Sequence, residues 1–155
     1  MSTKLLYHFV GNKLRDGREV PPDGEWLEHG GPIRCCESGL HACEHPFDAL
    51  RYAPGFTLCL VVVEGIEDRQ DDKVAARRRR IVKRIDMKEQ ILQFARDQAK
   101  KVLHLWDAPQ VVIDFLNTGQ NASAADAATA YAADYATAKL DVREEFLSLV
   151  KEVFA

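Results

Sequence analysis

The chain has no long hydrophobic run, and this lack excludes a helix that spans a membrane. Its longest apolar stretch, Leu58–Val63, falls far short of the roughly 20 apolar residues that a helix needs to cross a bilayer. The first residues, Met1-Ser2-Thr3-Lys4, lead into a short apolar segment without the hydrophobic core or the cleavage pattern of a signal peptide. We therefore expect no membrane association and a location in the cytoplasm.

The chain also lacks a strong net charge. Its 21 Lys and Arg residues against 24 Asp and Glu residues leave a formal charge of −3, so no overall field attracts nucleic acid or anionic lipid. Hydrophobic residues make up 46% and charged residues 29% of the 155 residues, which is typical of one globular domain. We predict a single domain over residues 1–155.

The pattern of residues changes near Asp86. Before it lie turn signals and short β-branched runs, which predict strands over 5–10, 56–64 and 73–85, a candidate short strand over 25–27 and a short helix over 47–52. A polar turn is expected over 67–72, and the 73–85 strand carries charge on both faces, which suggests an edge strand. The sequence thus predicts a small antiparallel or mixed sheet with a short helix in residues 1–85.

After Asp86, apolar residues recur at helical spacing. Asp86 itself resembles an N-cap, with Glu89 three residues later. A second helix is expected to end at Asn117-Thr118-Gly119, the segment 122–138 is rich in alanine, and a last helix begins near Val142. Residues 86–155 therefore form the helical half of a predicted α+β fold.

Three of the four cysteines and two of the five histidines fall between Cys35 and His45. Three interpretations remain open. The first is a zinc site of Cys36, His41, Cys43 and His45, whose spacing matches no familiar zinc module. The second is a Cys36 nucleophile with His41 as its base across the Ser38-Gly39 turn. The third, which we favour, is that the cysteines are small buried side chains and that His41 is a structural histidine.

Basic residues crowd the predicted 73–85 strand, in Arg77, Arg78, Arg79, Arg80 and Lys83. A solvated strand face is the simple explanation of such a charge run. The alternative is an anion-binding stripe for an acidic protein surface or for nucleic-acid phosphate, because guanidinium groups bind carboxylates and phosphates in pairs of hydrogen bonds.

The segment Cys36-x-Ser38-Gly39-Leu40-His41-Ala42 resembles a signature of an uncharacterised family of phage and prophage proteins. The similarity continues through Asp48-Ala49-Leu50-Arg51-Tyr52, Val63-Glu64-Gly65 and Asn117-Thr118-Gly119. Members often carry alanine-rich tails, as the segment 122–138 does. The resemblance implies an origin on a mobile genetic element and a cytoplasmic site of action in a bacterial host.

The order of elements also resembles that of ADP-ribosyltransferases. The similar parts are a strand with Tyr7-His8, the segment Gly39-Leu40-His41-Ala42 followed by a helix reaching Tyr52, and the strand Leu58–Val63. This resemblance implies NAD as the cofactor, with His8 and Tyr52 in the first two roles of the site. The late catalytic Glu has no obvious equivalent, because Glu64 comes too early in the chain.

From these patterns we predict a phage-encoded accessory protein that binds a host protein or ribonucleoprotein complex through Arg77–Arg80 and Lys83. Inhibition of a bacterial defence system such as CRISPR fits a compact protein of this origin. Binding is favoured over catalysis, and no cofactor is expected in this interpretation. The alternatives are an ADP-ribosyltransferase-like enzyme that uses NAD and a binding module stabilised by zinc.

Overall fold

The computed structural model describes residues 4–105, 107–120 and 142–155. The chain divides into two compact units, one made of the residues up to Met87 with Leu149–Ala155 and the other of Lys88–Ser148. This boundary lies beside the predicted change at Asp86, although the sequence pattern did not suggest that the last residues group with the first unit. Across the described ranges, no helix is long and apolar enough to cross a membrane.

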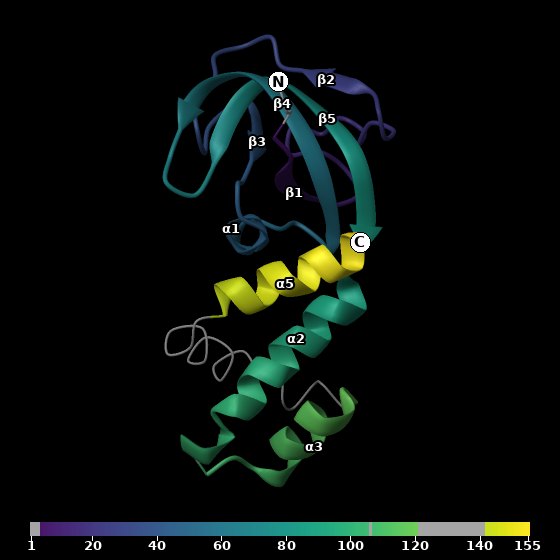
Figure 1. Ribbon diagram of the computed structural model, residues 1–155, viewed down its shortest axis with the longest axis vertical. Coiled ribbons are helices and arrows are strands. Elements are labelled where there is room, and N and C mark those ends of the chain that lie inside the picture. Colours follow the sequence, from purple (N-terminus) through teal and green to yellow (C-terminus); the bar gives the residue numbers. More distant parts are fainter. Residues whose placement is uncertain (1–3, 106, 121–141) are drawn as a thin grey trace. The chain divides into compact units, whose positions relative to one another are not determined.

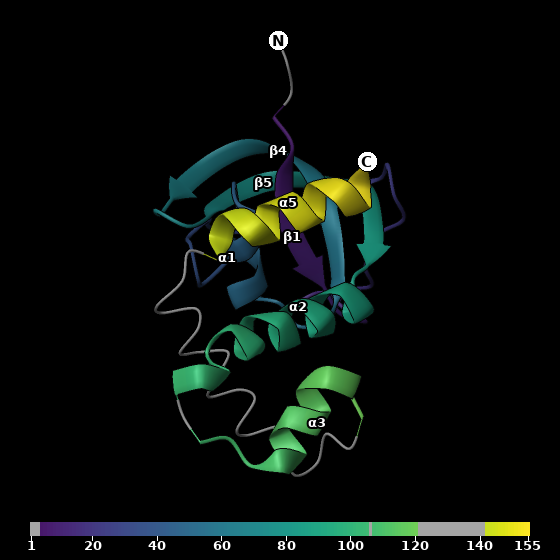
Figure 2. The same cartoon turned by 60° about the horizontal axis from the view of Figure 1, so that its bottom comes forward.

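The first unit is built on a five-stranded antiparallel sheet, which confirms the predicted α+β class (Figure 1). The strands run in the order β1-β4-β5-β2, and β3 pairs with β5 as well. Figure 2 shows β1 beside the long β4. The strand bounds are Leu6–Val10 (β1), Trp26–Glu28 (β2), Leu40–Ala42 (β3), Thr57–Arg69 (β4) and Val74–Asp86 (β5).

Strands β4 and β5 form one long hairpin. The predicted polar turn over 67–72 is confirmed only for residues 70–72, because β4 continues to Arg69 and the turn closes with a hydrogen bond from Gln70 N to Lys73 O of 2.8 Å. A break in register between Ile66 and Asp68, beside Gly65 at a φ of +65°, lets the polar residues continue the strand. Such bulges bend and twist a strand without ending its pairing.

Strand β5 lies inside the sheet, so the predicted edge position is wrong. One of its edges pairs with β4 over most of its length. Its other edge pairs with β3 at Val74–Ala76 and with β2 at Arg78–Arg80. The two partners on this second edge have three residues each, and such short strands leave little periodicity in a sequence.

The core of the sheet unit is formed by side chains of β1, β4 and β5. Ala42 of β3 joins them, and Cys59 is fully buried on the central strand, as predicted. Burying such apolar side chains contributes about 25 cal/mol per Å² of apolar surface. The buried cluster consists of Leu6, Val10, Ala42, Cys59, Val61, Val74 and Ile81.

The short helix α1 (Pro46–Arg51) begins where the sequence predicts. His45 is its N-cap, and the His45 Nδ1 atom accepts a hydrogen bond of 3.1 Å from the Phe47 N–H. Proline suits the first turn because it lacks the N–H that would otherwise stay unpaired.

The second unit contains α2 (Lys88–Lys101), the 3₁₀ turn η1 (Leu103–Leu105), α3 (Gln110–Thr118) and the first part of α5 (Arg143–Phe154). Asp86 is the last residue of β5, and α2 begins two residues after it, at Lys88. Helix α3 ends at Gly119 as predicted, with a left-handed φ of +71°. The alanine-rich segment 122–138 lies outside the described residues.

Helices α2 and α5 are joined by polar and aromatic contacts within this unit. The Glu145 carboxylate accepts hydrogen bonds from Gln98 Nε2 at 2.9 Å and from Lys101 Nζ at 2.7 Å. The rings of Phe94 and Phe146 meet edge to face with centroids 5.3 Å apart. Edge-to-face pairs of this kind add about 0.5–1.5 kcal/mol to the burial of the rings.

We predict that Gly39→Ala destabilises the protein more than Gly24→Ala does. Both glycines have left-handed backbones, with φ values of +100° and +92°. An added Cβ at Gly39 would lie 3.0 Å from Ile33 Cγ2, whereas it would meet nothing within 4 Å at Gly24. Because both substitutions strain the backbone, the difference between their losses of stability measures the clash with Ile33. We expect this clash to cost about 1–3 kcal/mol. Denaturant unfolding of both variants checks this, and equal losses would contradict it.

Candidate functional site

The cysteine-rich segment folds into a tight turn ahead of β3. Arg34 and Ser38 exchange backbone hydrogen bonds of 3.0 and 2.9 Å across it. Cys36, inside the turn, has a φ of +71° and is the one residue other than glycine with a positive φ in the described part of the chain. The Asp68 carboxylate accepts the Cys35 N–H at 2.7 Å, and this hydrogen bond lowers the pKa of Asp68. The turn is thereby tied to the end of β4.

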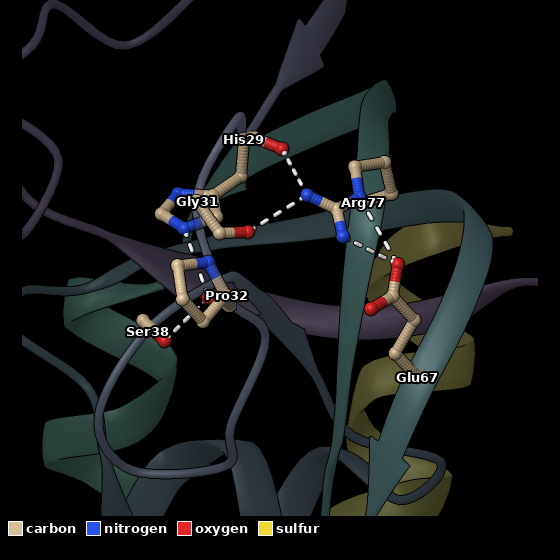
Figure 3. A network of polar contacts seen from close by, with 6 residues as sticks. All are labelled: His29, Gly31, Pro32, Ser38, Glu67 and Arg77. Atoms are coloured by element: carbon tan, nitrogen blue, oxygen red, sulfur yellow. Dashed lines mark hydrogen bonds and ion pairs between the residues drawn. The ribbon is translucent and has the colours of Figure 1, made fainter.

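Arg77 of β5 holds the loop that precedes this turn (Figure 3). Its guanidinium pairs with the Glu67 carboxylate at 2.6 Å and donates to two backbone carbonyl oxygens of the loop. The Ser38 hydroxyl donates to the carbonyl oxygen of Pro32 at 2.6 Å, which closes the loop on the turn. The two carbonyls that accept from Arg77 are those of His29 (3.0 Å) and Gly31 (2.7 Å).

The four candidate metal ligands have other roles. Cys43 is buried, and burial raises the pKa of its thiol to about 12. His45 caps helix α1 through Nδ1, and His41 Nε2 accepts the Cys36 N–H at 3.1 Å. Within residues 4–105, 107–120 and 142–155, no three His, Cys, Asp or Glu side chains gather as metal ligands. The described chain therefore offers no preformed zinc site.

The Cys36 side chain is exposed, contrary to the interpretation that it packs in the core. Its Sγ atom contacts the Gln70 amide oxygen at 3.8 Å, and the Cys36 side chain also interacts with Lys73. His41 is bound to the backbone N–H of Cys36 rather than to the thiol. A nucleophile and its base need a hydrogen bond between their side chains, and these two residues meet through the backbone.

A cavity of about 670 Å³ lies in the sheet unit against the inner side of this turn. Its wall combines residues 8–10 of β1, the loop 13–16, the segment 36–43 and residues around Tyr52. A cavity of this size is typical of a small-molecule site. Six of the predicted site residues line it, namely His8, Cys36, His41, Cys43, Tyr52 and Arg79.

Two basic side chains in the wall of this cavity are buried. Lys73 is 6% and Arg79 is 5% exposed. Arg79 donates to the carbonyl oxygen of His41, and the Lys73 Nζ atom lies 4.0 Å from the centre of the Tyr52 ring. In the part of the chain that the structure describes, neither cation has a carboxylate at ion-pair distance. Burial lowers the pKa of Arg79 to about 10, so its guanidinium is still charged at neutral pH.

Two imidazoles of the cavity wall are neutral. Burial lowers the pKa of His8 well below its usual value, and the charges of Arg79 and His41 lower it further. Burial also lowers the pKa of His41, with Lys73 and Arg79 acting in the same direction. Since His41 Nε2 accepts a hydrogen bond from a backbone N–H, its ring carries the proton on Nδ1. The wall of the cavity thus combines two charged side chains, Lys73 and Arg79, with two neutral imidazole rings that can form hydrogen bonds.

Tyr52 stands at the rim of the cavity and is 48% exposed. Its hydroxyl donates to the Asp72 carboxylate, and this hydrogen bond lowers the pKa of Asp72. Together with the Lys73 ammonium above it, this contact fixes the orientation of the ring. His8 and Tyr52, which stand 44 positions apart in the sequence, therefore face one cavity.

The first two residues of the predicted arginine stripe are engaged by neighbouring strands. Arg77 pairs with Glu67 of β4, as described above. Arg78 pairs with Glu28 of β2 at 2.9 Å and with Glu64 of β4 at 2.7 Å. Their charges are therefore compensated within the sheet unit.

The other three residues of that stripe face different surroundings. Arg79 lines the cavity, and the Arg80 guanidinium lies 4.8 Å from the centre of the Trp26 ring. Lys83 donates to the carbonyl oxygen of Phe154 at 3.4 Å and lies near its ring. The five residues consequently do not share a single free face.

The neutral histidines predict a loss of stability in mild acid. Unfolded His8 takes up a proton as the pH falls through about 6.5, whereas folded His8 resists it. The contribution of His8 to the free energy of unfolding is therefore fully present above about pH 6.5 and is lost as the pH decreases further. The loss amounts to about 1.4 kcal/mol for each pH unit by which the folded pKa is lowered. We expect His8→Gln to lose less stability than the wild type between pH 7 and 5 in thermal or denaturant unfolding.

The exposed His104 supplies the matched control, because His104→Gln should follow the wild-type pH dependence. The carboxylates with lowered pKa values, such as Asp16 and Asp72, titrate at more acidic pH and leave this window unaffected. The same pH slope in His8→Gln and the wild type would show that His8 is not the group responsible.

Comparison with known proteins places the sheet unit in a family. A family model described as "Domain of unknown function (DUF7666)" matches residues 4–93, a span that contains every residue lining the cavity. No curated protein and no solved structure matches the chain.

Proposed function

The chain belongs to this family of unknown function, DUF7666, and on the geometry of its cavity we propose that it binds NAD and acts as an ADP-ribosyltransferase-like enzyme. The observation that carries the proposal is the convergence of His8 and Tyr52 on one cavity that also holds two buried cations. His8 and Tyr52 are the residues that the resemblance to ADP-ribosyltransferases singles out.

The wall of the cavity suits the parts of NAD. The buried cations offer charge to its diphosphate. The neutral ring of His8 can exchange hydrogen bonds with ribose hydroxyls, and the exposed part of the Tyr52 ring offers a surface for a base. Apolar contacts would come from Phe9, Leu14 and Pro54 on the same wall. A site with an apolar wall and a few placed polar groups is typical of cofactor binding.

The proposed reaction transfers ADP-ribose to a nucleophile. The bond between the nicotinamide nitrogen and ribose C1′ breaks, nicotinamide leaves with the bonding electrons, and a nucleophile of the acceptor forms a new bond to C1′ as it loses its proton. A carboxylate commonly takes such a proton. Glu64 is unsuited to this role, since it pairs with Arg78 and does not line the cavity.

Two carboxylates do line the cavity, those of Asp16 and Glu37. Asp16 is paired with Arg18 at 2.7 Å, whereas Glu37 has only a long contact of 3.9 Å with Arg34. The proposal therefore assigns the role of proton acceptor to Glu37, although the resemblance gave no candidate for it.

The predicted phage origin suggests which kind of molecule accepts the ADP-ribose. An enzyme from a mobile genetic element would modify a host macromolecule, and a component of a defence system such as CRISPR is one such acceptor. A role confined to binding through Arg77–Arg80 and Lys83 has less support, because the sheet unit already engages these side chains through ion pairs, ring contacts and burial.

We predict that the purified protein binds NAD in calorimetry and transfers label from NAD labelled in its adenosine part to a protein or nucleic acid of a bacterial lysate. His8→Ala and Tyr52→Ala should each lower transfer by about 10- to 100-fold, because a placed contact contributes about 1–3 kcal/mol. His104→Ala serves as the control and should transfer like the wild type.

Glu37→Gln tests the assigned base separately. We expect it to retain NAD binding and to lose transfer, because an amide accepts no proton in this pH range. The absence of both NAD binding and transfer in the wild-type protein would overturn the proposed function.

A further inference from the structure

We infer that Lys73 and Arg79 form an anion subsite of the cavity, which binds the phosphate or diphosphate group of its ligand. The inference rests on the proposed function only for the identity of the whole ligand. The subsite itself is argued from the burial, the partners and the positions of these two side chains.

The first argument is the cost of burying charge without a counter-ion. Lys73 and Arg79 are at least nine-tenths buried, and burying an ion takes several kcal/mol of hydration from it unless an opposite charge compensates. Elsewhere in the same strand this compensation is present, since Arg77 and Arg78 have glutamate partners at 2.6–2.9 Å. For Lys73 and Arg79 no carboxylate lies at such a distance in the described part of the chain, and the acidic charges that act on them, Asp72 on Lys73 and Asp16 on Arg79, do so without a direct ion pair.

The second argument is the number of donors left open. A guanidinium has five N–H donors, and one hydrogen bond is recorded for Arg79, from Nη1 to the carbonyl oxygen of His41. Lys73 has three donors; its ammonium lies over the Tyr52 ring, and it also interacts with the side chains of Cys36 and Tyr52. Both side chains line the cavity. Lys73 also borders a second, smaller hollow whose wall includes Asp71 and Asp72, so it is chiefly the open donors of Arg79 that face the cavity. The occupant that satisfies them is an oxyanion.

The third argument concerns the kind of anion. Arg79 lies in the middle of β5 and Lys73 immediately before its first residue, a span of six residues that extends over roughly 20 Å of strand. Both cations nevertheless line the same cavity and act on the same His41 ring, and a diphosphate with its spread oxygens satisfies two separate cations better than a single carboxylate. The neutral His8 and His41 beside them add hydrogen bonds without a competing charge.

The test measures binding of inorganic pyrophosphate, ADP-ribose and NAD to the wild-type protein and to two variants, Lys73→Met and Arg79→Met, by calorimetry. Each variant should weaken the binding of all three probes by at least tenfold. Arg80→Met is the matched control, because Arg80 is the next residue of the same strand but lies against Trp26 and does not line the cavity. It should bind every probe like the wild type.

Thermal unfolding without ligand separates a binding role from a structural one. If Lys73 binds an anion, Lys73→Met should lose the rise in unfolding midpoint that pyrophosphate produces, whatever the loss of its contacts with Cys36 and Tyr52 does to the midpoint without ligand. A purely structural role predicts a lower midpoint with the rise retained. This readout needs the Lys73 variant alone, so it remains decisive even where Arg79→Met fails to fold.

The outcomes also distinguish the subsite from the proposed function. Binding of pyrophosphate and ADP-ribose that depends on Lys73 and Arg79, without any transfer from NAD, would support the subsite and overturn the transferase. Transfer from NAD that neither variant weakens would overturn the subsite and leave the transferase standing. If the wild-type protein binds none of the three probes, the subsite is overturned.

Discussion

Strand β5 is hydrogen-bonded along both of its edges, to β4 on one side and to β2 and β3 on the other. An arginine-rich strand at an edge could leave all its cations in water. Inside a sheet, successive side chains point to opposite faces. Each basic side chain therefore lies against an acidic or aromatic side chain, or against a cavity, on its own face of the sheet. The positions of the basic side chains, and with them the candidate site, follow from this double pairing.

The charges of β5 are divided between two uses. Glutamates of β2 and β4 neutralise Arg77 and Arg78, and the Arg77 pair also holds the loop that leads into the cysteine-rich turn. Lys73 and Arg79 lack such partners in the described chain and line the cavity instead. Buried charges without counter-ions lower the stability of the free protein, and functional sites commonly carry such a cost.

Much of the local structure could be predicted from the residue pattern. The central apolar strand, the long strand after it and the helix stop at Gly119 follow from β-branched runs, helical spacing and glycine at a left-handed position. The pairing of the strands could not be predicted. Alternation shows which residues share a face, but strands as short as β2 and β3 show no period from which their partner could be inferred, and the charge pattern alone favours an edge position for β5.

The sequence by itself determined the chemical groups that are available, and the resemblance it carries named His8 and Tyr52. Only the tertiary structure decided that these two face one cavity, that Arg79 is buried there while Arg78 is neutralised, and that His41 is held by the backbone of Cys36. The reason is physical: the pKa, the partner and the exposure of a side chain depend on strands far away in the sequence, and those strands come together only when the sheet has formed.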